Sequence, residues 1–325
     1  AERLVRYANV ALMTREDDLR ALISEKGLED RMRGSAERFL KRVRCVDIEA
    51  EGALREELAR AYVELGEGKK WAVDLAGARD IVKDPVYFSV LATRLGYADM
   101  IVGGVSHASR DFFIPCLRLL ERQEVVYEMA IFALDDGPEE PEYPARNVYV
   151  FADVALNPVP TPEALARIAV GSCKTLRDMI PAADLPEVNC ALLSYSTRGS
   201  GEGPSVQRVR DAAEMIPGYL EALRSEGSSY ESIRISAELQ ISVALSQAKA
   251  RSKLGPSLAE VPAAGKANVL IAPNLDVGNL LYHFSATRNP DCQNVLIIGG
   301  MHNRALDFSR SSSADDIVLG AKGLI

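Results

Sequence analysis

The chain has 325 residues, of which 47% are hydrophobic and 26% are charged, a composition typical of soluble globular proteins. Its formal net charge of -8 argues against a nucleic-acid partner, because a surface that binds phosphate backbones must be basic. No apolar run reaches the roughly 18 residues that a membrane span needs, and the first residues lack the apolar core of a signal peptide. We therefore expect no membrane association. The length allows one large domain or two of medium size.

The cysteines and histidines indicate the compartment and exclude one class of site. The 5 cysteines are scattered, odd in number and never spaced as C-x-x-C, which predicts reduced thiols and a cytoplasmic location. The 3 histidines show no close spacing, so we expect no metal site. A small anionic ligand remains compatible with the negative net charge, because a few arginines in one pocket can dominate the local potential.

Apolar runs alternate with helix signals along most of the chain. The first 75 residues are rich in charged helix formers, with one strand candidate at 45–48. Asp84-Pro85 predicts a helix start, because aspartate caps a helix and proline suits its first turn, and this helix should end at Gly96. Thr161-Pro162 predicts a second helix start in the same way. The other runs that we interpret as strands are 99–104, 125–134, 148–151, 189–194, 268–272 and 295–299.

This alternation of strands and helices predicts a mostly parallel sheet with helices on both sides. The segment 135–144 is acidic and carries three prolines, so it cannot be a regular helix or a central strand. It is either a long solvated loop or a domain boundary, and we favour the boundary. A second gap at 289–291 marks where the chain crosses back. The predicted domains are therefore 1–146 plus 291–325, and 147–290.

Polar segments follow several of the predicted strands, where open α/β sheets bind ligands. In Ser194–Gly203, glycines let the main chain approach a ligand closely, and a following helix start favours anions. Arg198 adds a fork of donors that suits phosphate. The alternative is a flexible loop with an exposed arginine.

Two further groups carry possible chemistry. Ser309 and Arg310 can bind an anionic oxygen group, and one of the carboxylates of Asp315 and Asp316 can act as a general base. The alternative for Asp315 and Asp316 is capping of the last helix, which the spacing alone favours. His107 follows the glycine pair at the end of the 99–104 run. A lone histidine is more often structural than catalytic, and no serine stands in a G-x-S-x-G turn.

Taken together, these segments resemble the phosphate acetyltransferase and phosphate butyryltransferase family. The segments that carry the resemblance are 84–88, 95–99, 104–115, 151–153, 193–200, 238–240, 265–270, 278–279, Tyr282 and 307–310. The resemblance implies two α/β/α three-layer sandwich domains of the isocitrate/isopropylmalate dehydrogenase type with a cleft between them. It also implies a homodimer with the second domain, 147–290, at the interface.

The resemblance implies an enzyme that transfers an acyl group (acetyl, propionyl or butyryl) between coenzyme A and inorganic phosphate. Its substrates are then acyl-CoA and phosphate or acyl phosphate, with coenzyme A as a substrate and no separate cofactor. Ser309 and Arg310 match the family's phosphate-binding pair, and Asp316 matches its base. The residues implied to bind substrate are Ser196, Thr197, Arg198, Ser200, His107, Asn279 and Tyr282.

The chain also departs from the family pattern. Ile114 stands where the family usually has an arginine before Pro115, and a second family arginine is missing near Glu64. The alternative is therefore a catalytically impaired member that binds acyl-CoA or a related anionic ligand as a regulatory or binding protein. The retained Ser309, Arg310 and Asp316 favour the enzyme.

Overall fold

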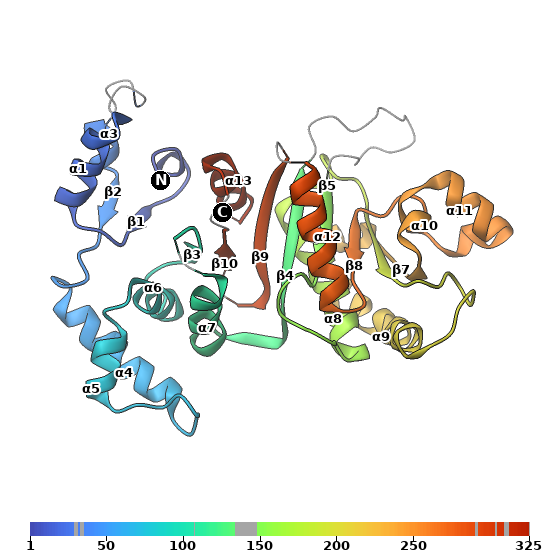
Figure 1. The fold of residues 1–325 in the computed structure, drawn as a ribbon, viewed down its shortest axis with the longest axis horizontal. Coiled ribbons are helices and arrows are strands. Elements are labelled where there is room, and N and C mark those ends of the chain that lie inside the picture. Colours follow the sequence, from blue (N-terminus) through green and yellow to red (C-terminus); the bar gives the residue numbers. More distant parts are fainter. Residues whose placement is uncertain are drawn as a thin grey trace. The chain divides into compact units, whose positions relative to one another are not determined.

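The computed structural model describes residues 1–325 apart from 29–31, 33–35, 107, 134–147, 290–291, 303, 309–311 and 325. The predicted loop or boundary at 135–144 lies outside the described residues. The contacts divide the chain into two compact units, and each is described on its own (Figure 1). Unit 1 comprises Ala1–Glu121 and His302–Ile325, and unit 2 comprises Arg122–Met301. The predicted boundaries would instead assign strands β4 and β9 of unit 2 to the first domain.

Unit 2 contains a largely parallel sheet. Its strands are β4 (Arg122–Ala133), β5 (Val148–Ala152), β6 (Val188–Leu193), β7 (Ile233–Leu239), β8 (Val269–Ile271) and β9 (Gln293–Met301). They lie in the order β9-β4-β5-β8-β6-β7. β5, β8, β6 and β7 run parallel to one another, whereas β4 is antiparallel to both of its neighbours.

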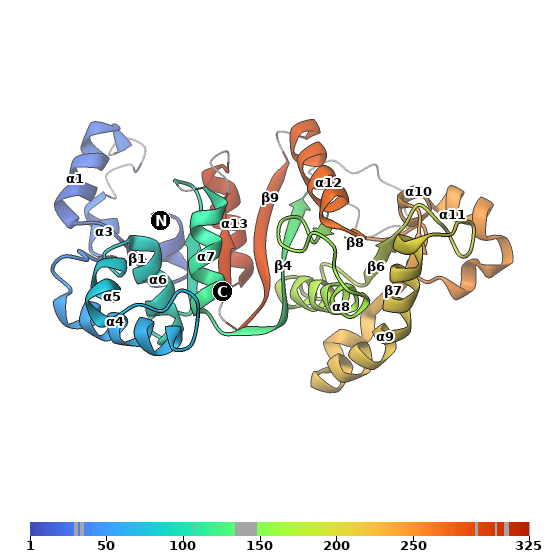
Figure 2. The same cartoon turned by 60° about the horizontal axis from the view of Figure 1, so that its bottom comes forward.

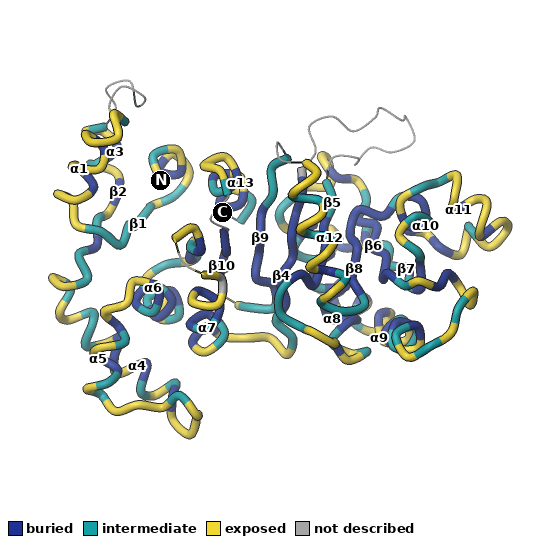
Figure 3. Tube along the Cα trace, in the orientation of Figure 1, coloured by how far each residue is buried: buried dark blue, intermediate teal, exposed yellow. Residues whose placement is uncertain are grey.

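Helices cover both faces of this sheet, which gives the predicted three-layer α/β/α arrangement. The helices of unit 2 are α8 (Pro162–Met179), α9 (Pro204–Glu226), η2 (Ser228–Ser232), α10 (Ile241–Leu245), α11 (Gln247–Leu254), η3 (Gly255–Glu260) and α12 (Leu275–Arg288). In Figure 2, α8 lies on one side of the strands and α12 on the other. Every residue of β6 is buried, because each face of a central strand packs against helices (Figure 3).

Local signals explain where the main helices of unit 2 begin. Thr161 Oγ1 accepts a hydrogen bond from Ala164 N at 3.1 Å, with Pro162 in the first turn of α8, as predicted. Asn274 Oδ1 accepts from Val277 N at 3.0 Å and caps α12. The Thr161 cap follows β5 and the Asn274 cap follows β8, each after a short connection. Each helix therefore begins soon after a strand ends.

Unit 1 is richer in helices. Its elements are η1 (Leu4–Arg6), β1 (Val10–Leu12), α1 (Glu16–Glu25), α3 (Ala36–Leu40), β2 (Val43–Cys45), α4 (Gly52–Gly66), α5 (Leu75–Ile81), α6 (Pro85–Arg94), β3 (Met100–Gly103), α7 (Ser109–Leu119), β10 (Arg304–Asp307) and α13 (Ala314–Leu324). β1 pairs with β2 and β3 pairs with β10, both in parallel. The Asp84 cap is formed as predicted, since Asp84 Oδ1 accepts from Val86 N at 2.8 Å. In the described part of the chain, no helix combines the length and apolar character needed to cross a bilayer.

Candidate active site

The carboxyl ends of four parallel strands lie at one edge of the unit 2 sheet. Asp153 follows β5, the loop 194–203 follows β6, Glu238 stands at the end of β7, and Asn274 follows β8. Because these strands are parallel, the segments that follow them gather at the same edge. The predicted substrate-binding residues of unit 2 belong to this edge or to α12, which starts there.

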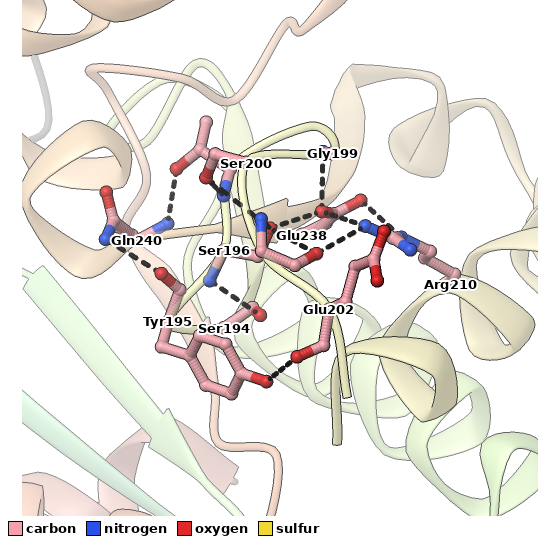
Figure 4. A network of polar contacts seen from close by, with 11 residues as sticks. Ser194, Tyr195, Ser196, Gly199, Ser200, Glu202, Arg210, Glu238 and Gln240 are labelled. Carbon is pink, nitrogen blue, oxygen red and sulfur yellow. Dashed lines mark hydrogen bonds and ion pairs between the residues drawn. The ribbon is translucent and has the colours of Figure 1, made fainter. Parts of the chain in front are cut away.

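The loop 194–203, which we call the β6–α9 loop, is held by its own polar groups (Figure 4). Ser196 N donates to Ser194 Oγ at 3.0 Å, Thr197 N to Ser200 Oγ at 2.8 Å, and Gly201 N to Ser196 Oγ at 2.8 Å. Gln240 Nε2 donates to Tyr195 O at 2.8 Å. These contacts connect the loop to itself and to Gln240.

The three hydroxyls that we predicted to bind substrate make hydrogen bonds within the protein. Ser196 is 0% exposed and donates to Glu238 Oε1 at 2.6 Å. Thr197 is also buried, and its Oγ1 accepts from Gln240 N at 3.2 Å. Ser200 is exposed, but its Oγ accepts from Thr197 N. In this structure, these three side chains shape the loop.

Glu238 and Arg210 form the charged centre of this edge. Arg210 Nε donates to Glu238 Oε2 at 2.9 Å, and Arg210 Nη2 donates to Glu238 Oε1 at 2.8 Å. These hydrogen bonds lower the pKa of Glu238 to about 2, although its burial acts in the opposite direction, and Ser196 and Gly199 add to the lowering. The carboxylate is therefore ionised at neutral pH and fully engaged.

Among the described residues that we predicted to bind an anion, Arg198 has an accessible side chain. Its side chain is 49% exposed, and its guanidinium lies 3.2 Å from Glu260 Oε2, which is 68% exposed. An ion pair between such exposed groups is weak, about 0–1 kcal/mol, so an incoming anion can replace Glu260. A pocket of about 300 Å³ lies beside this loop, with Arg198, Arg210, Glu238 and Glu260 in its lining.

Of the two predicted residues on α12, Asn279 contacts the connection that follows β5, and Tyr282 contacts β4. Asn279 Nδ2 donates to Val154 O at 3.3 Å, and the ring of Tyr282 packs against Phe132 with a centroid distance of 6.0 Å. Asp153 is 4% exposed and organises this connection, since its carboxylate accepts from the main-chain N–H groups of four residues. These four donors are Glu128, Ala155, Leu156 and Asn157.

In unit 1, Asp316 caps its own helix. Ser313 N and Ser313 Oγ donate to Asp316 Oδ2 at 2.7 and 2.8 Å, and Asp316 N donates to Ser313 Oγ at 3.1 Å. This is the capping arrangement that the spacing alone favoured. Asp316 is also 6% exposed, so its carboxylate is buried as well as fixed. Its role as a base stays a prediction.

The predicted residues Ser309, Arg310 and His107 lie outside the described residues. The segment that leads to Ser309 is described: Asp307 and Phe308 are buried at the end of β10. Gly104 has φ +92, and a side chain there would overlap Asp307 Oδ1. The glycine at the end of the 99–104 run is therefore required by close packing against the end of β10.

Sequence reasoning missed Glu238, Arg210 and Asp153 as organisers of this edge. The signal available for Asp153 was a charged residue directly after an apolar strand, a place where a buried carboxylate needs several donors, whereas Glu238 stands in a strand of mixed polarity that gave no such signal. Arg210 is one of several arginines on α9, and nothing in the sequence separates it from the others. Ile114, at the position of a family arginine, lies half-buried in α7.

Comparisons with known proteins identify the family of this chain. A family model described as "Phosphate acetyl/butaryl transferase" matches residues 19–321. The phosphate acetyltransferase of Thermoanaerobacterium thermosaccharolyticum is 32% identical over 263 residues, covering 81% of this chain and 74% of that protein. The phosphate acetyltransferase of Clostridium acetobutylicum is 31% identical, covering 81% of this chain and 73% of that protein.

Solved structures give the same result at the level of the fold. The crystal structure of a phosphotransacetylase from Streptococcus pyogenes superposes with a TM-score of 0.73 at 26% identity. The superposition covers 99% of this chain and 94% of that one. The family model, the relatives and the superposed structure all span most of the described fold. This chain therefore belongs to the phosphate acetyl/butaryl transferase family.

Proposed function

We propose that this chain is an enzyme that transfers an acyl group between coenzyme A and inorganic phosphate. The observation that carries the proposal is the match of the family model to residues 19–321, which includes every residue to which we assign a chemical role. The relatives that match over most of their length are named phosphate acetyltransferase. Acetyl, propionyl and butyryl groups are the candidate acyl groups.

The reaction makes three demands on a site. In the direction of acyl-CoA formation, the thiol loses its proton to a base, and the thiolate sulfur attacks the carbonyl carbon of the acyl phosphate. The bond between that carbon and the bridging oxygen then breaks, and inorganic phosphate leaves. The site must therefore hold a base, donors for the oxyanion and cations for the phosphate.

We assign these roles to residues that match the family pattern. Ser309 and Arg310 bind the phosphate, and Asp316 accepts the thiol proton. Ser313 supports this role for Asp316, because its two hydrogen bonds hold the buried carboxylate in one orientation at the start of α13. Arg198 supplies a further cation for the phosphate, and its weak pairing with Glu260 leaves it available.

The remaining predicted residues contribute in two ways. His107, Asn279 and Tyr282 are proposed to contact the substrate. Ser196, Thr197 and Ser200 are proposed to act by shaping the β6–α9 loop, a role that their hydrogen bonds support. We also propose that the protein is cytoplasmic and forms a homodimer through its second domain.

The test is phosphate-dependent release of free thiol from acetyl-, propionyl- and butyryl-CoA. We expect turnover by the unchanged protein, and a loss of at least about 100-fold in both Arg310→Ala and Asp316→Asn, since each removes a group required in the transition state. Calorimetric binding of coenzyme A without any turnover would support instead the impaired, ligand-binding alternative. A matched control is Asp315→Asn, which changes the neighbouring exposed carboxylate and should leave turnover within about twofold.

A further inference from the structure

We propose that Glu238 is a positioning residue that clamps the main chain around Arg198 and thereby holds its guanidinium ready for the substrate phosphate. This inference rests on the proposed function and assigns a role to a residue that does not itself touch substrate. Glu238 accepts two hydrogen bonds from main-chain N–H groups of the loop. Gly199 N donates to Glu238 Oε1 at 2.7 Å, and Arg198 N donates to Glu238 O at 3.2 Å.

The backbone of β7 is distorted in a way that aims the Glu238 carboxylate at the loop. Ala191 pairs with Ser236 and Leu193 with Leu239, so β7 has one residue more than β6 between these pairs. Such a bulge redirects a side chain, and bulges are common beside active sites. Glu238 also has φ +55, a left-handed conformation that is unfavourable for a residue with a side chain. The surrounding contacts of its carboxylate account for why the chain accepts this conformation.

The loop shows the matching distortion at Arg198. Its φ is +46, again in the left-handed region. The two hydrogen bonds to Glu238 come from Arg198 and from the next residue, so they fix the peptide on either side of the strained position. Strain of this kind persists only where neighbouring contacts over-determine it. If the clamp is lost, the loop is free to relax and Arg198 points elsewhere.

Every main-chain N–H from Ser196 to Gly201 donates to an acceptor of the protein itself. These groups are therefore not available for a phosphate, and the exposed guanidinium of Arg198 is the donor that the loop offers. Figure 4 shows the Glu238 carboxylate among Ser196, Gly199 and Arg210. The Glu238 carboxylate thus stabilises the loop by accepting hydrogen bonds from it.

Arg210 completes the clamp from α9. It donates to both oxygens of Glu238, and its Nη2 also donates to Gly201 O at 3.0 Å. The pair therefore ties the start of the loop, its end and the bulge of β7 into one unit. The pocket of about 300 Å³ beside the loop gives Arg198 space to move when this unit is broken.

The test combines the variants Glu238→Gln and Arg198→Ala with their double variant. Glu238→Gln keeps one oxygen as an acceptor but loses the charge that Arg210 and the loop require. We expect the KM for phosphate to rise about 10- to 100-fold in each single variant, with a smaller change in kcat, because misplaced binding groups cost this much. If Glu238 acts through Arg198, the double variant is no worse than Arg198→Ala alone. Multiplied effects in the double variant would overturn the proposal.

Hydrogen exchange separates this proposal from the proposed function. In Glu238→Gln, the amides of Arg198 and Gly199 should exchange at least 10-fold faster than in the unchanged protein, whereas Arg198→Ala should leave the Gly199 amide unchanged. Glu187→Gln is the control, since it neutralises another carboxylate of unit 2, which pairs with Lys266 at 3.2 Å. Unchanged exchange in a folded Glu238→Gln protein would refute the clamp, even if the enzyme turned over. Faster exchange with no turnover in the unchanged protein would keep the clamp and refute the proposed reaction.

Discussion

At the scale of single residues, two buried carboxylates organise unit 2 in different ways. Glu238 pairs with Arg210, whereas Asp153 binds main-chain N–H groups that would otherwise lack partners at the end of β5. A buried donor without an acceptor costs about 1–3 kcal/mol. The Asp153 carboxylate therefore stabilises the connection between β5 and α8 by an amount comparable to a large part of a domain's stability.

We predict that Asp153→Ala lowers the free energy of unfolding by about 3 kcal/mol, because it leaves one buried and three partly buried N–H groups without their acceptor. Urea unfolding followed by circular dichroism measures this loss. Asp211→Ala is the control: Asp211 accepts one hydrogen bond, from Gln207 on the exposed side of α9, so the change should stay within about 0.5 kcal/mol. Equal losses in the two variants would contradict the role of Asp153.

The low pKa of Glu238 predicts how stability depends on pH. Its folded pKa of about 2 lies below the ordinary 4.5, so the ionised carboxylate stabilises the fold above about pH 4.5. This contribution is lost as the pH falls from 4.5 toward 2. At pH 6 we expect the free energy of unfolding of the unchanged protein to exceed that of Glu238→Gln by on the order of 1 kcal/mol, since solvent near the ion pair screens part of the effect. Urea unfolding at pH 6, 4 and 3 should show the gap shrinking, and a constant gap would contradict the account.

Residue types at strand ends were readable from the sequence, but their partners were not. The sequence of 188–203 correctly indicated a strand followed by a polar loop. It did not reveal that Ser196 and Thr197 face inward, because their acceptor and donor stand some 40 residues further along the chain. These partners are Glu238 of β7 and Gln240, which follows β7. The register between β6 and β7 decides which serine forms hydrogen bonds within the protein and which is available to a ligand. This register includes a bulge.

At the scale of elements, caps and apolar runs predicted most of unit 2 correctly. β5, β6, β8 and β9 lie within two residues of the predicted runs, and α6 and α8 begin at their predicted prolines. β7 was missed, because its run Ile233–Leu239 alternates apolar with polar residues and includes the charged Arg234 and Glu238. The antiparallel direction of β4 was also not predicted, since strand direction depends on connections rather than on local pattern.

The packing of α12 against the end of β5 gives an element-scale prediction. A side chain at Gly278 would overlap the main-chain oxygen of Asp153, whereas one at Gly218, inside α9, would meet nothing within 4 Å. Gly278→Ala should therefore destabilise the protein by about 1–3 kcal/mol through overpacking. Gly218→Ala should be neutral or stabilising by up to about 1 kcal/mol, because alanine favours a helix interior. Thermal unfolding of the two variants decides, and destabilisation by both would show that the contact with Asp153 is not the cause.

At the scale of the whole molecule, unit 2 exposes apolar side chains on α12. Leu280 is 67% exposed and Phe284 is 63% exposed, one helical turn apart on the same face. We propose this face as part of the homodimer interface. Sedimentation should give twice the 35.3 kDa of one chain for the unchanged protein, and close to a single chain for Phe284→Glu. Leu95→Glu, at an exposed leucine of unit 1, should leave the dimer intact. A monomer for the unchanged protein would contradict the proposed assembly.

The central claim is that this chain moves an acyl group between coenzyme A and phosphate, and one assay tests it most directly. Purified protein is mixed with acetyl-CoA, and the release of free thiol is followed with and without inorganic phosphate, beside Asp316→Asn. We predict release that requires phosphate and falls at least about 100-fold in the variant. Thiol release that does not depend on phosphate, or that is the same in Asp316→Asn, would contradict the account.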